Sequence, residues 1–193
     1  MIELLRKFFP YEYVKDVFSI DYEKLAESGY KAIIFDIDNT LVHHGDDSNE
    51  LVDELFRQIH SKGLKTLLLS NNSAERIERF IKNIDTLYIE EAEKPDKAGY
   101  TKALEMLDVK KEEAIVIGDQ IFTDIYGANK CGIPCVLVEF IRKDKNAKIG
   151  KKRMLEKVIL YFYGKSKLKH RIREIIKKES GNENVSDKGK IVL

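Results

Sequence analysis

The chain has 193 residues, 43% of them hydrophobic, so it is long enough for one well-formed core and too short for two ordinary domains. Its longest purely apolar or aromatic run, residues 158–163, is far shorter than a membrane span, and the amino-terminal residues lack the apolar stretch of a secretory signal. We therefore expect a cytoplasmic protein in which Cys131 and Cys135 are buried or free thiols rather than a disulfide or a metal site.

The formal net charge of +1 conceals an uneven distribution of charge along the chain. Residues 1–141 hold 17 Lys and Arg against 27 Asp and Glu, whereas residues 142–178 hold 15 against 3. Such segregation suggests that the basic segment faces an anionic partner. We divide the chain into an amino-terminal helical segment (1–28), a core (29–141), a basic helical extension (142–178) and a disordered tail (179–193).

Within the core, five short apolar runs alternate with helical patterns. The runs lie at 32–35, 66–69, 86–89, 115–117 and 135–138, and apolar residues recur with helical spacing over 49–61, 74–83, 97–107 and 121–131. Strands that alternate with single helices predict a three-layer α/β fold with a mostly parallel sheet and helices on both faces. The runs are continuously apolar, as expected of strands buried on both sides.

Two amphipathic stretches follow the core. Helical spacing predicts a helix over 151–163 that stops near Gly164, and a second over 167–178 whose polar face is Lys and Arg. Most amphipathic helices cover a core, so the first could simply pack on the sheet. The second is then the better candidate for an anionic membrane interface. Nucleic acid is a less favoured partner, because the segment lacks the alternation of Arg and aromatic residues suited to base stacking.

Polar residues come directly after three of the predicted strands: Asp36, Ser70 and Asp119. Because the carboxyl ends of parallel strands share one edge, and ligands bind there, we expect these residues to meet at one crevice. A carboxylate in such a place can attack phosphorus and form an aspartyl-phosphate. Asp38, two residues beyond the first strand, could protonate the leaving group and then activate the hydrolytic water.

Neighbouring residues could bind the phosphate and a cation. Ser70 and the N–H of Asn71 can hold phosphoryl oxygens, and Lys94 can neutralise the charge that develops on them. Hard oxygen ligands from Asp36, Asp119 and Asp124 suit Mg²⁺.

Each of these residues taken singly has an ordinary structural explanation. A strand-terminal Asp, and equally Ser70, is often a helix cap, and Lys94 could be solvated. His43 and His44 are expected to be solvated or structural, although they lie near enough to the crevice to touch a substrate. The order and joint placement of the whole set favour catalysis.

These segments resemble the four motifs of the haloacid dehalogenase (HAD) superfamily phosphatases, whose fold is Rossmann-like. DIDNT at 36–40 resembles the first motif, LLLSNN at 67–72 the second, the Lys of EKPD at 93–96 the third and GDQIFTD at 118–124 the fourth. The resemblance implies a nucleophile, a general acid/base, phosphate binders, a charge clamp and Mg²⁺ ligands. By that resemblance Asp36 is the nucleophile and Asp38 the general acid/base. Ser70 and Asn71 bind phosphate, and Lys94 is the charge clamp. Asp36, the Asp38 carbonyl and Asp119 hold Mg²⁺, and Asp124 orients Lys94 or a metal-bound water.

The spacing of the motifs bears on the size of the substrate. Superfamily members often insert a cap domain between the first and second motifs or between the second and third. Here Ser70 lies 32 positions after Asp38 and Lys94 lies 24 positions after Ser70, and each gap is used by one helix and one strand. We therefore expect no cap and an open crevice, which suits a phosphate group carried by a large molecule or assembly.

The flanking sequence adds a second resemblance. Residues 4–42 are similar to the start of the capless subfamily III A branch of the YqeG type, related to the phosphatidylglycerophosphate phosphatases of mitochondria and plastids. That resemblance implies removal of the terminal phosphate from phosphatidylglycerophosphate, which gives phosphatidylglycerol. Together with the basic extension it favours a protein peripheral to the inner face of the membrane. Two alternatives remain open: a soluble phosphatase for a small sugar or nucleotide phosphate, and a nucleic-acid or ribosome-associated binding protein with a vestigial site.

Overall fold

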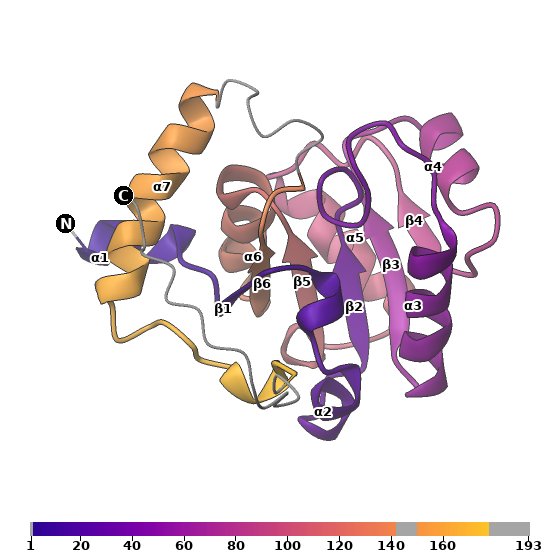
Figure 1. Ribbon diagram of the computed structural model, residues 1–193, viewed down its shortest axis with the longest axis horizontal. Coiled ribbons are helices and arrows are strands. Elements are labelled where there is room, and N and C mark those ends of the chain that lie inside the picture. Colours follow the sequence, from indigo (N-terminus) through magenta and orange to yellow (C-terminus); the bar gives the residue numbers. More distant parts are fainter. Residues whose placement is uncertain (1, 142–149, 178–193) are drawn as a thin grey trace, which may run out of the picture.

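The computed structural model describes residues 2–141 and 150–177, which form a parallel six-stranded sheet between two layers of helices (Figure 1). The strand order is β1-β6-β5-β2-β3-β4. β2 lies between β5 and β3, so the two halves of the sheet diverge from it, and ligands bind at the carboxyl ends of strands at such a switch point. The strands are β1 (Glu12–Val14), β2 (Ala32–Phe35), β3 (Lys65–Leu69), β4 (Leu87–Ile89), β5 (Ala114–Gly118) and β6 (Cys135–Val138).

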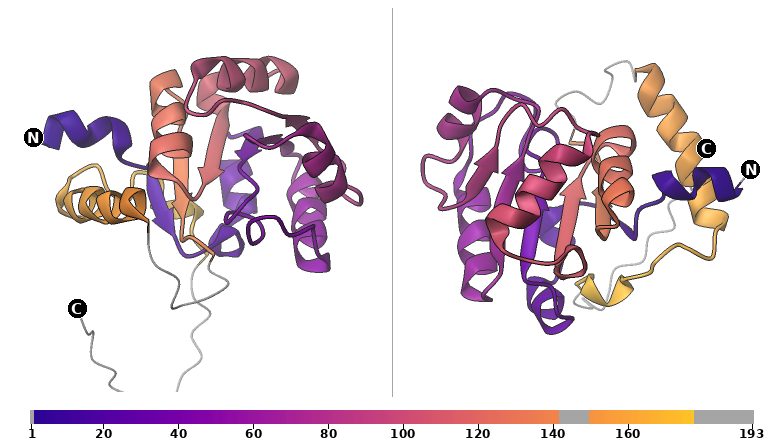
Figure 2. Two further views of the ribbon diagram at one scale, coloured as in Figure 1. Left: turned by 90° about the horizontal axis from the view of Figure 1, so that it is seen from above. Right: turned by 180° about the vertical axis from the view of Figure 1, so that it is seen from behind.

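Helices lie on both sides of the sheet, as the view from above shows (Figure 2). Two helices of the core begin at a side-chain cap: the side chain of Asn49 accepts hydrogen bonds at the start of α3, and that of Asp96 at the start of α5. The α-helices are α1 (Ile2–Leu5), α2 (Tyr22–Glu27), α3 (Glu50–Ser61), α4 (Ala74–Phe80), α5 (Lys97–Leu107), α6 (Tyr126–Cys131) and α7 (Lys151–Lys165). Short 3₁₀ turns lie at Arg6–Phe8, Val17–Ser19, Lys111–Glu113 and Arg173–Ile175, and a π-helical turn at Ile121–Ile125 leads into α6.

Alternate residues of the strands serve two separate cores. In β2, Ile33 and Phe35 face the core under α2, α3 and α4, whereas Ala32 and Ile34 face the core under α5, α6 and α7. All four side chains are fully buried. Burial of a large apolar side chain contributes roughly 1.5–3 kcal/mol, so a sheet covered on both faces is stabilised by strands that are apolar at every position.

The structure confirms the predicted three-layer α/β fold, and each of the five predicted strands is present with its ends shifted by one residue at most. The amino-terminal segment 1–28, expected to be helical, also holds β1, which pairs in parallel with β6. This strand was not predicted, because its three residues show no alternation and its partners lie more than a hundred residues away. From Asp36 to Lys94, a range described without a gap, the chain adds no domain to α3, β3, α4 and β4, so the expected absence of a cap is confirmed.

The prediction for the carboxyl-terminal extension is half right. α7 forms as expected, although it continues through Gly164 to Lys165. The second helix, predicted over 167–178, is wrong for the described residues up to 177: these form turns and a short 3₁₀ helix. Ile172 and Ile175 are buried against the core of α2, and Ile176 forms a bridge with Ile20. These tertiary contacts outweigh the helical spacing. The expected disordered tail, 179–193, lies outside the described residues.

Two further expectations can be compared with the structure. Cys131 and Cys135 are both free, and Cys135 is buried, as predicted. Within the described ranges, each helix is too short or too polar to cross a bilayer.

Gly127 tests the packing between α6 and α5. A Cβ built at this position would lie 2.4 Å from the hydroxyl oxygen of Tyr100, a fully buried side chain. We expect Gly127→Ala to lower the free energy of unfolding by about 1–3 kcal/mol through overpacking, measured by urea denaturation. The control is Gly164→Ala in α7, where a Cβ meets open space and a gain of up to about 1 kcal/mol is expected. Wild-type stability of Gly127→Ala would contradict this packing.

Candidate active site

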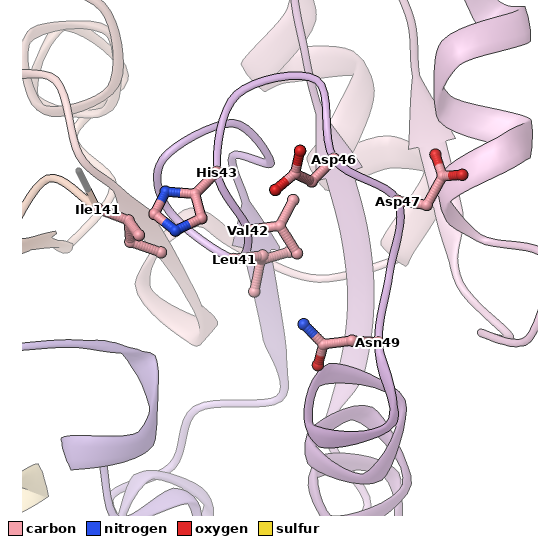
Figure 3. A pocket seen from close by; sticks show the side chains of 7 residues that line it. All are labelled: Leu41, Val42, His43, Asp46, Asp47, Asn49 and Ile141. Carbon is pink, nitrogen blue, oxygen red and sulfur yellow. The ribbon is translucent and has the colours of Figure 1, made fainter. Parts of the chain in front are cut away.

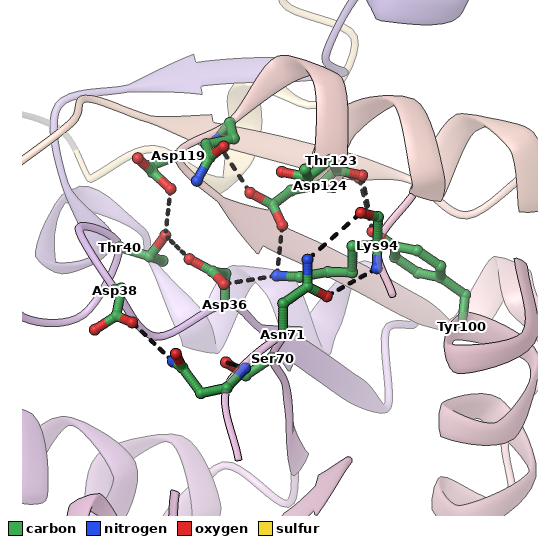
Figure 4. Close-up of polar contacts among 12 residues, drawn as sticks. Asp36, Asp38, Thr40, Ser70, Asn71, Lys94, Tyr100, Asp119, Thr123 and Asp124 are labelled. Atoms are coloured by element: carbon green, nitrogen blue, oxygen red, sulfur yellow. Dashed lines mark hydrogen bonds and ion pairs between the residues drawn. The ribbon is translucent and has the colours of Figure 1, made fainter. Parts of the chain in front are cut away.

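The residues predicted to share a crevice do come together at the carboxyl edge of the sheet (Figure 4). Asp36 follows β2, Ser70 follows β3 and Asp119 follows β5. The pairing of Phe35 with Ile117 places Asp36 and Asp119 on adjacent strand ends. Sheet topology therefore assembles the site from segments that are distant in sequence.

Lys94 is the positive centre of the site. Its Nζ donates to Asp36 Oδ1 at 2.6 Å and to Asp124 Oδ1 at 2.7 Å. The lysine side chain is only 5% exposed, and a charge so buried is tolerated because it is paired. Burial lowers the pKa of Lys94, but the charges of Asp124 and Asp36 raise it by more, so the net pKa is raised and the side chain stays cationic.

The side chain of Asn71 holds the backbone of Lys94 in place. Its Oδ1 accepts from the Lys94 N–H at 2.8 Å, and its Nδ2 lies 3.5 Å from the Lys94 carbonyl oxygen. The side chain of Asn71 is thus engaged with protein, which leaves its backbone N–H as the group that can meet a phosphate. Ser70 is buried, and its hydroxyl accepts from the N–H of Asn72 at 3.2 Å. Ser70 therefore lies at the crevice as predicted and also orders the turn that follows β3.

Three carboxylates gather beside Lys94. Asp36, Asp119 and Asp124 each offer an oxygen, and these oxygens lie within 4.8 Å of one another. Thr40 connects two of them, since its Oγ1 donates to Asp36 Oδ2 at 3.0 Å and lies 3.5 Å from Asp119 Oδ1. Gly118 makes the arrangement possible, because a Cβ there would lie 2.5 Å from side-chain atoms of Asp124. A cluster of hard oxygens of this kind fits a divalent cation such as Mg²⁺.

Asp36 and Asp119 of this cluster have raised pKa values. Burial raises the pKa of Asp36 to about 6, although the charge of Lys94 acts against it. Burial, followed by the charges of Asp36 and Asp124, raises the pKa of Asp119 to about 8. Like charges in a dry site disfavour full ionisation, so a cation that binds here must displace protons.

Asp38 lies apart from the three clustered carboxylates. Its carboxylate accepts from Asn72 Nδ2 at 2.7 Å, the Gly45 N–H at 3.0 Å and Arg76 Nη2 at 3.3 Å. Burial raises the pKa of Asp38, but these hydrogen bonds and the charges of Arg76 and His44 outweigh burial, and the net pKa is lowered. Its side chain is therefore not brought to the cation cluster, and its resting state is an anion suited to act as a base.

Some polar residues of the site were not singled out from the sequence. Thr40 lies inside the first motif, so its position signalled a role. Asn72 and Arg76, which hold Asp38, lie in and just after the second motif but show no pattern of their own. Arg153 and Glu156 of α7 had no signal at all. Arg153 pairs with Asp119, and Glu156 accepts from the Ile121 N–H at 2.9 Å.

A pocket opens beside the loop that follows Asp38 (Figure 3). His43 lines it, and the neighbouring His44 places its Nδ1 3.3 Å from Asp38 Oδ2, so one of the two histidines reaches the acid/base candidate. The carboxylates of Asp46 and Asp47 line the pocket without a lysine or arginine among the lining residues, so it does not suit phosphate. Its lining residues are Leu41, Val42, His43, Asp46, Asp47, Asn49 and Ile141.

Comparison with known proteins places this site in a family. The family model for haloacid dehalogenase-like hydrolases matches residues 46–132. "Probable phosphatase YqeG" of Bacillus subtilis is 38% identical over 137 residues, which are 70% of this chain and 80% of that protein. "Pyrophosphatase PpaX" of Bacillus cereus is 30% identical over 138 residues, 67% of this chain and 63% of that protein.

Solved structures are more distant. The cobalt-bound deoxy-D-mannose-octulosonate 8-phosphate phosphatase (YrbI) of Haemophilus influenzae aligns with a TM-score of 0.44 and 18% identity, over 76% of this chain and 93% of that one. An uncharacterised protein of Listeria monocytogenes aligns with a TM-score of 0.49 and 19% identity, over 69% and 99%. By its similarity to YqeG over most of both sequences and by the match to the family model, the chain belongs to the haloacid dehalogenase-like hydrolase family, as a homologue of its phosphatases.

Proposed function

We propose that this protein is a Mg²⁺-dependent phosphomonoester hydrolase that forms an aspartyl-phosphate on Asp36 and acts on phosphatidylglycerophosphate at a membrane surface. The observation that carries the chemistry is the placement of Asp36, a carboxylate at the end of the central strand, held between Lys94 and Thr40. Phosphatase relatives support the reaction class, and the surface of α7 supports the lipid.

In the first step, a carboxylate oxygen of Asp36 bonds to phosphorus and the bond from phosphorus to the ester oxygen breaks. The departing alkoxide takes a proton from the carboxyl group of Asp38. Because Asp38 is an anion at rest, it must first acquire that proton, and His44 is close enough to supply it. The ammonium group of Lys94 balances the negative charge that the phosphate brings to Asp36.

In the second step, water attacks the phosphorus of the aspartyl-phosphate and the bond to the Asp36 oxygen breaks. Asp38 takes a proton from this water and inorganic phosphate is released. The protonated Asp38 can then serve the next leaving group directly, or lose its proton to solvent and return to the resting anion. The N–H of Asn71 and the hydroxyl of Ser70 are placed to hold phosphoryl oxygens throughout. A cation held by Asp36, Asp119 and Asp124 would neutralise the charge that carboxylates and phosphate bring together.

A large, lipid-borne substrate is favoured by the exposed face of α7. Met154, Leu155, Val158 and Tyr161 are each at least half exposed, which is unusual for apolar side chains that share one helix. The exposed charged residues of this helix are all lysines: Lys151, Lys152, Lys157 and Lys165. An apolar face flanked by lysines suits the interface of an anionic bilayer. α7, rather than the segment 167–177, is therefore the proposed membrane element.

Cation binding should tighten as the pH rises. Asp36 and Asp119 have pKa values raised to about 6 and about 8, so both must be deprotonated to bind a cation. We expect the Kd of Mg²⁺ to fall as the pH rises from 7 to 8.5, by about tenfold or less per pH unit, and more steeply below pH 7 where both carboxyl groups release protons. Calorimetry in buffers of different ionisation enthalpy measures both quantities. A Kd that does not change over this range would contradict the assignment.

Substrate class is tested with a panel of phosphate esters in Mg²⁺. We expect kcat/KM for phosphatidylglycerophosphate in vesicles to exceed that for sugar phosphates and nucleotides on the order of 10²-fold, because binding at the surface concentrates the substrate. Asp36→Asn should lower turnover by at least about 10⁴-fold, and Asp85→Asn, at an exposed carboxylate, should not.

Release of phosphate from the soluble esters alone would overturn the lipid proposal and favour a small substrate. Turnover retained by Asp36→Asn would instead show that the nucleophile is another residue.

Membrane docking is tested on α7. Leu155→Glu and Val158→Glu alter exposed side chains, so we expect normal folding and normal hydrolysis of p-nitrophenyl phosphate, but roughly tenfold or more weaker sedimentation with vesicles that contain phosphatidylglycerol. Leu51→Glu, at an exposed leucine of α3, is the control. Binding that matches wild type in both α7 variants would rule this helix out as the membrane element.

A further inference from the structure

Arg153 reaches the cation cluster from outside the core of the fold. It belongs to α7, thirty-four residues after Asp119 in the sequence. Its Nη1 donates to the backbone oxygen of Asp119 at 2.5 Å, and its Nη2 pairs with Asp119 Oδ2 in a short contact. The side chain of Asp119 is fully buried and that of Arg153 is 23% exposed, so salt screens this ion pair less than a pair on the surface.

The two carboxylate oxygens of Asp119 therefore have different surroundings. Oδ2 is occupied by Arg153, whereas Oδ1 lies 3.5 Å from the hydroxyl of Thr40. That hydroxyl donates its single proton to Asp36 at the shorter distance of 3.0 Å. Oδ1 is thus the oxygen on the side of Asp36, with its lone pairs available to a cation.

Arg153 is itself held in place. Glu156 Oε2 accepts from Nη1 at 2.9 Å, and Glu156 Oε1 accepts from the Ile121 N–H at 2.9 Å. The guanidinium carbon lies 4.5 Å from the centroid of the Phe140 ring. α7 consequently forms hydrogen bonds with both ends of the segment 119–121: Arg153 binds Asp119, and Glu156 binds the N–H of Ile121.

We infer that Arg153 is a positioning residue for the cation site: by occupying Oδ2 and the backbone oxygen of Asp119, it presents Oδ1 to a divalent cation shared with Asp36. The inference rests on the proposed function, since it assumes that the cluster binds a cation. Partners that orient a ligating carboxylate commonly change metal affinity by 10–100-fold when they are lost. The planar fork of arginine makes two contacts at once, which lysine cannot do.

The test is direct binding of Mn²⁺ by the full chain, measured by calorimetry after the protein has been treated with a chelator. We expect Arg153→Ala to weaken Mn²⁺ binding 10–100-fold and Arg153→Lys to weaken it less. Lys152→Ala removes an exposed cation from the neighbouring position of α7 and should leave the Kd unchanged. Turnover of p-nitrophenyl phosphate by Arg153→Ala should return towards wild type when Mn²⁺ is raised 100-fold, which a general loss of structure would not allow.

The outcomes separate the possible failures. An equal or tighter Kd in Arg153→Ala, with binding intact in wild type, would overturn the inference alone; a tighter Kd would mean that Arg153 competes with the cation. Absence of Mn²⁺ binding by wild type would overturn the proposed cation site and this inference with it. If Arg153→Ala does not fold, Glu156→Gln provides the test. Loss of the Glu156 carboxylate that pairs with Arg153 should weaken Mn²⁺ binding several-fold. An unchanged Kd would overturn the inference.

Discussion

The buried ion pairs of Lys94 are the interaction on which the rest of the site depends. Asp36 and Asp124 lie close together in a dry environment, where two anions cannot remain ionised without a cation between them. Their mutual repulsion is offset by one ammonium group that is itself almost inaccessible to water. Because breaking such a pair leaves a buried charge unpaired, the ends of β2, β4 and β5, after which these groups lie, must stay in register. The ion pairs that stabilise this edge of the sheet therefore also hold Asp36 and Lys94 in the positions that the proposed reaction needs.

Arg153 of α7 is a second cationic side chain that pairs with a carboxylate of the site. Arg153 pairs with Asp119 as Lys94 pairs with Asp36 and Asp124, so three carboxylates meet two buried or half-buried cations. With all three carboxylates ionised, one net negative charge would remain at the cluster, which a divalent cation can neutralise. The same helix turns exposed apolar side chains outward. α7 therefore connects the proposed membrane face with the cluster of carboxylates.

Asp38 illustrates how one sequence motif is divided between two environments. It is only two residues from Asp36, yet its carboxylate turns to Asn72 and Arg76 and its pKa is lowered, while that of Asp36 is raised. Environments that push the pKa values of two nearby acids apart are typical of acid and base pairs with separate roles. The separation arises because β2 ends at Phe35: beyond it the chain leaves the sheet and carries Asp38 towards α4.

The sequence by itself determined the α/β architecture and most of the site. Apolar runs of strand length are a local signal, and each catalytic candidate is tied to the end of such a run, so the positions of Asp36, Ser70 and Asp119 followed from chain order and the rules of parallel sheets. Only the tertiary structure decided what depends on distant partners. β1 is a strand because β6 lies beside it, and Ile172 and Ile175 are buried by α2 rather than arranged along a helix. Arg153 belongs to the site because α7 packs back on the sheet, a contact between residues far apart in sequence that no local periodicity encodes.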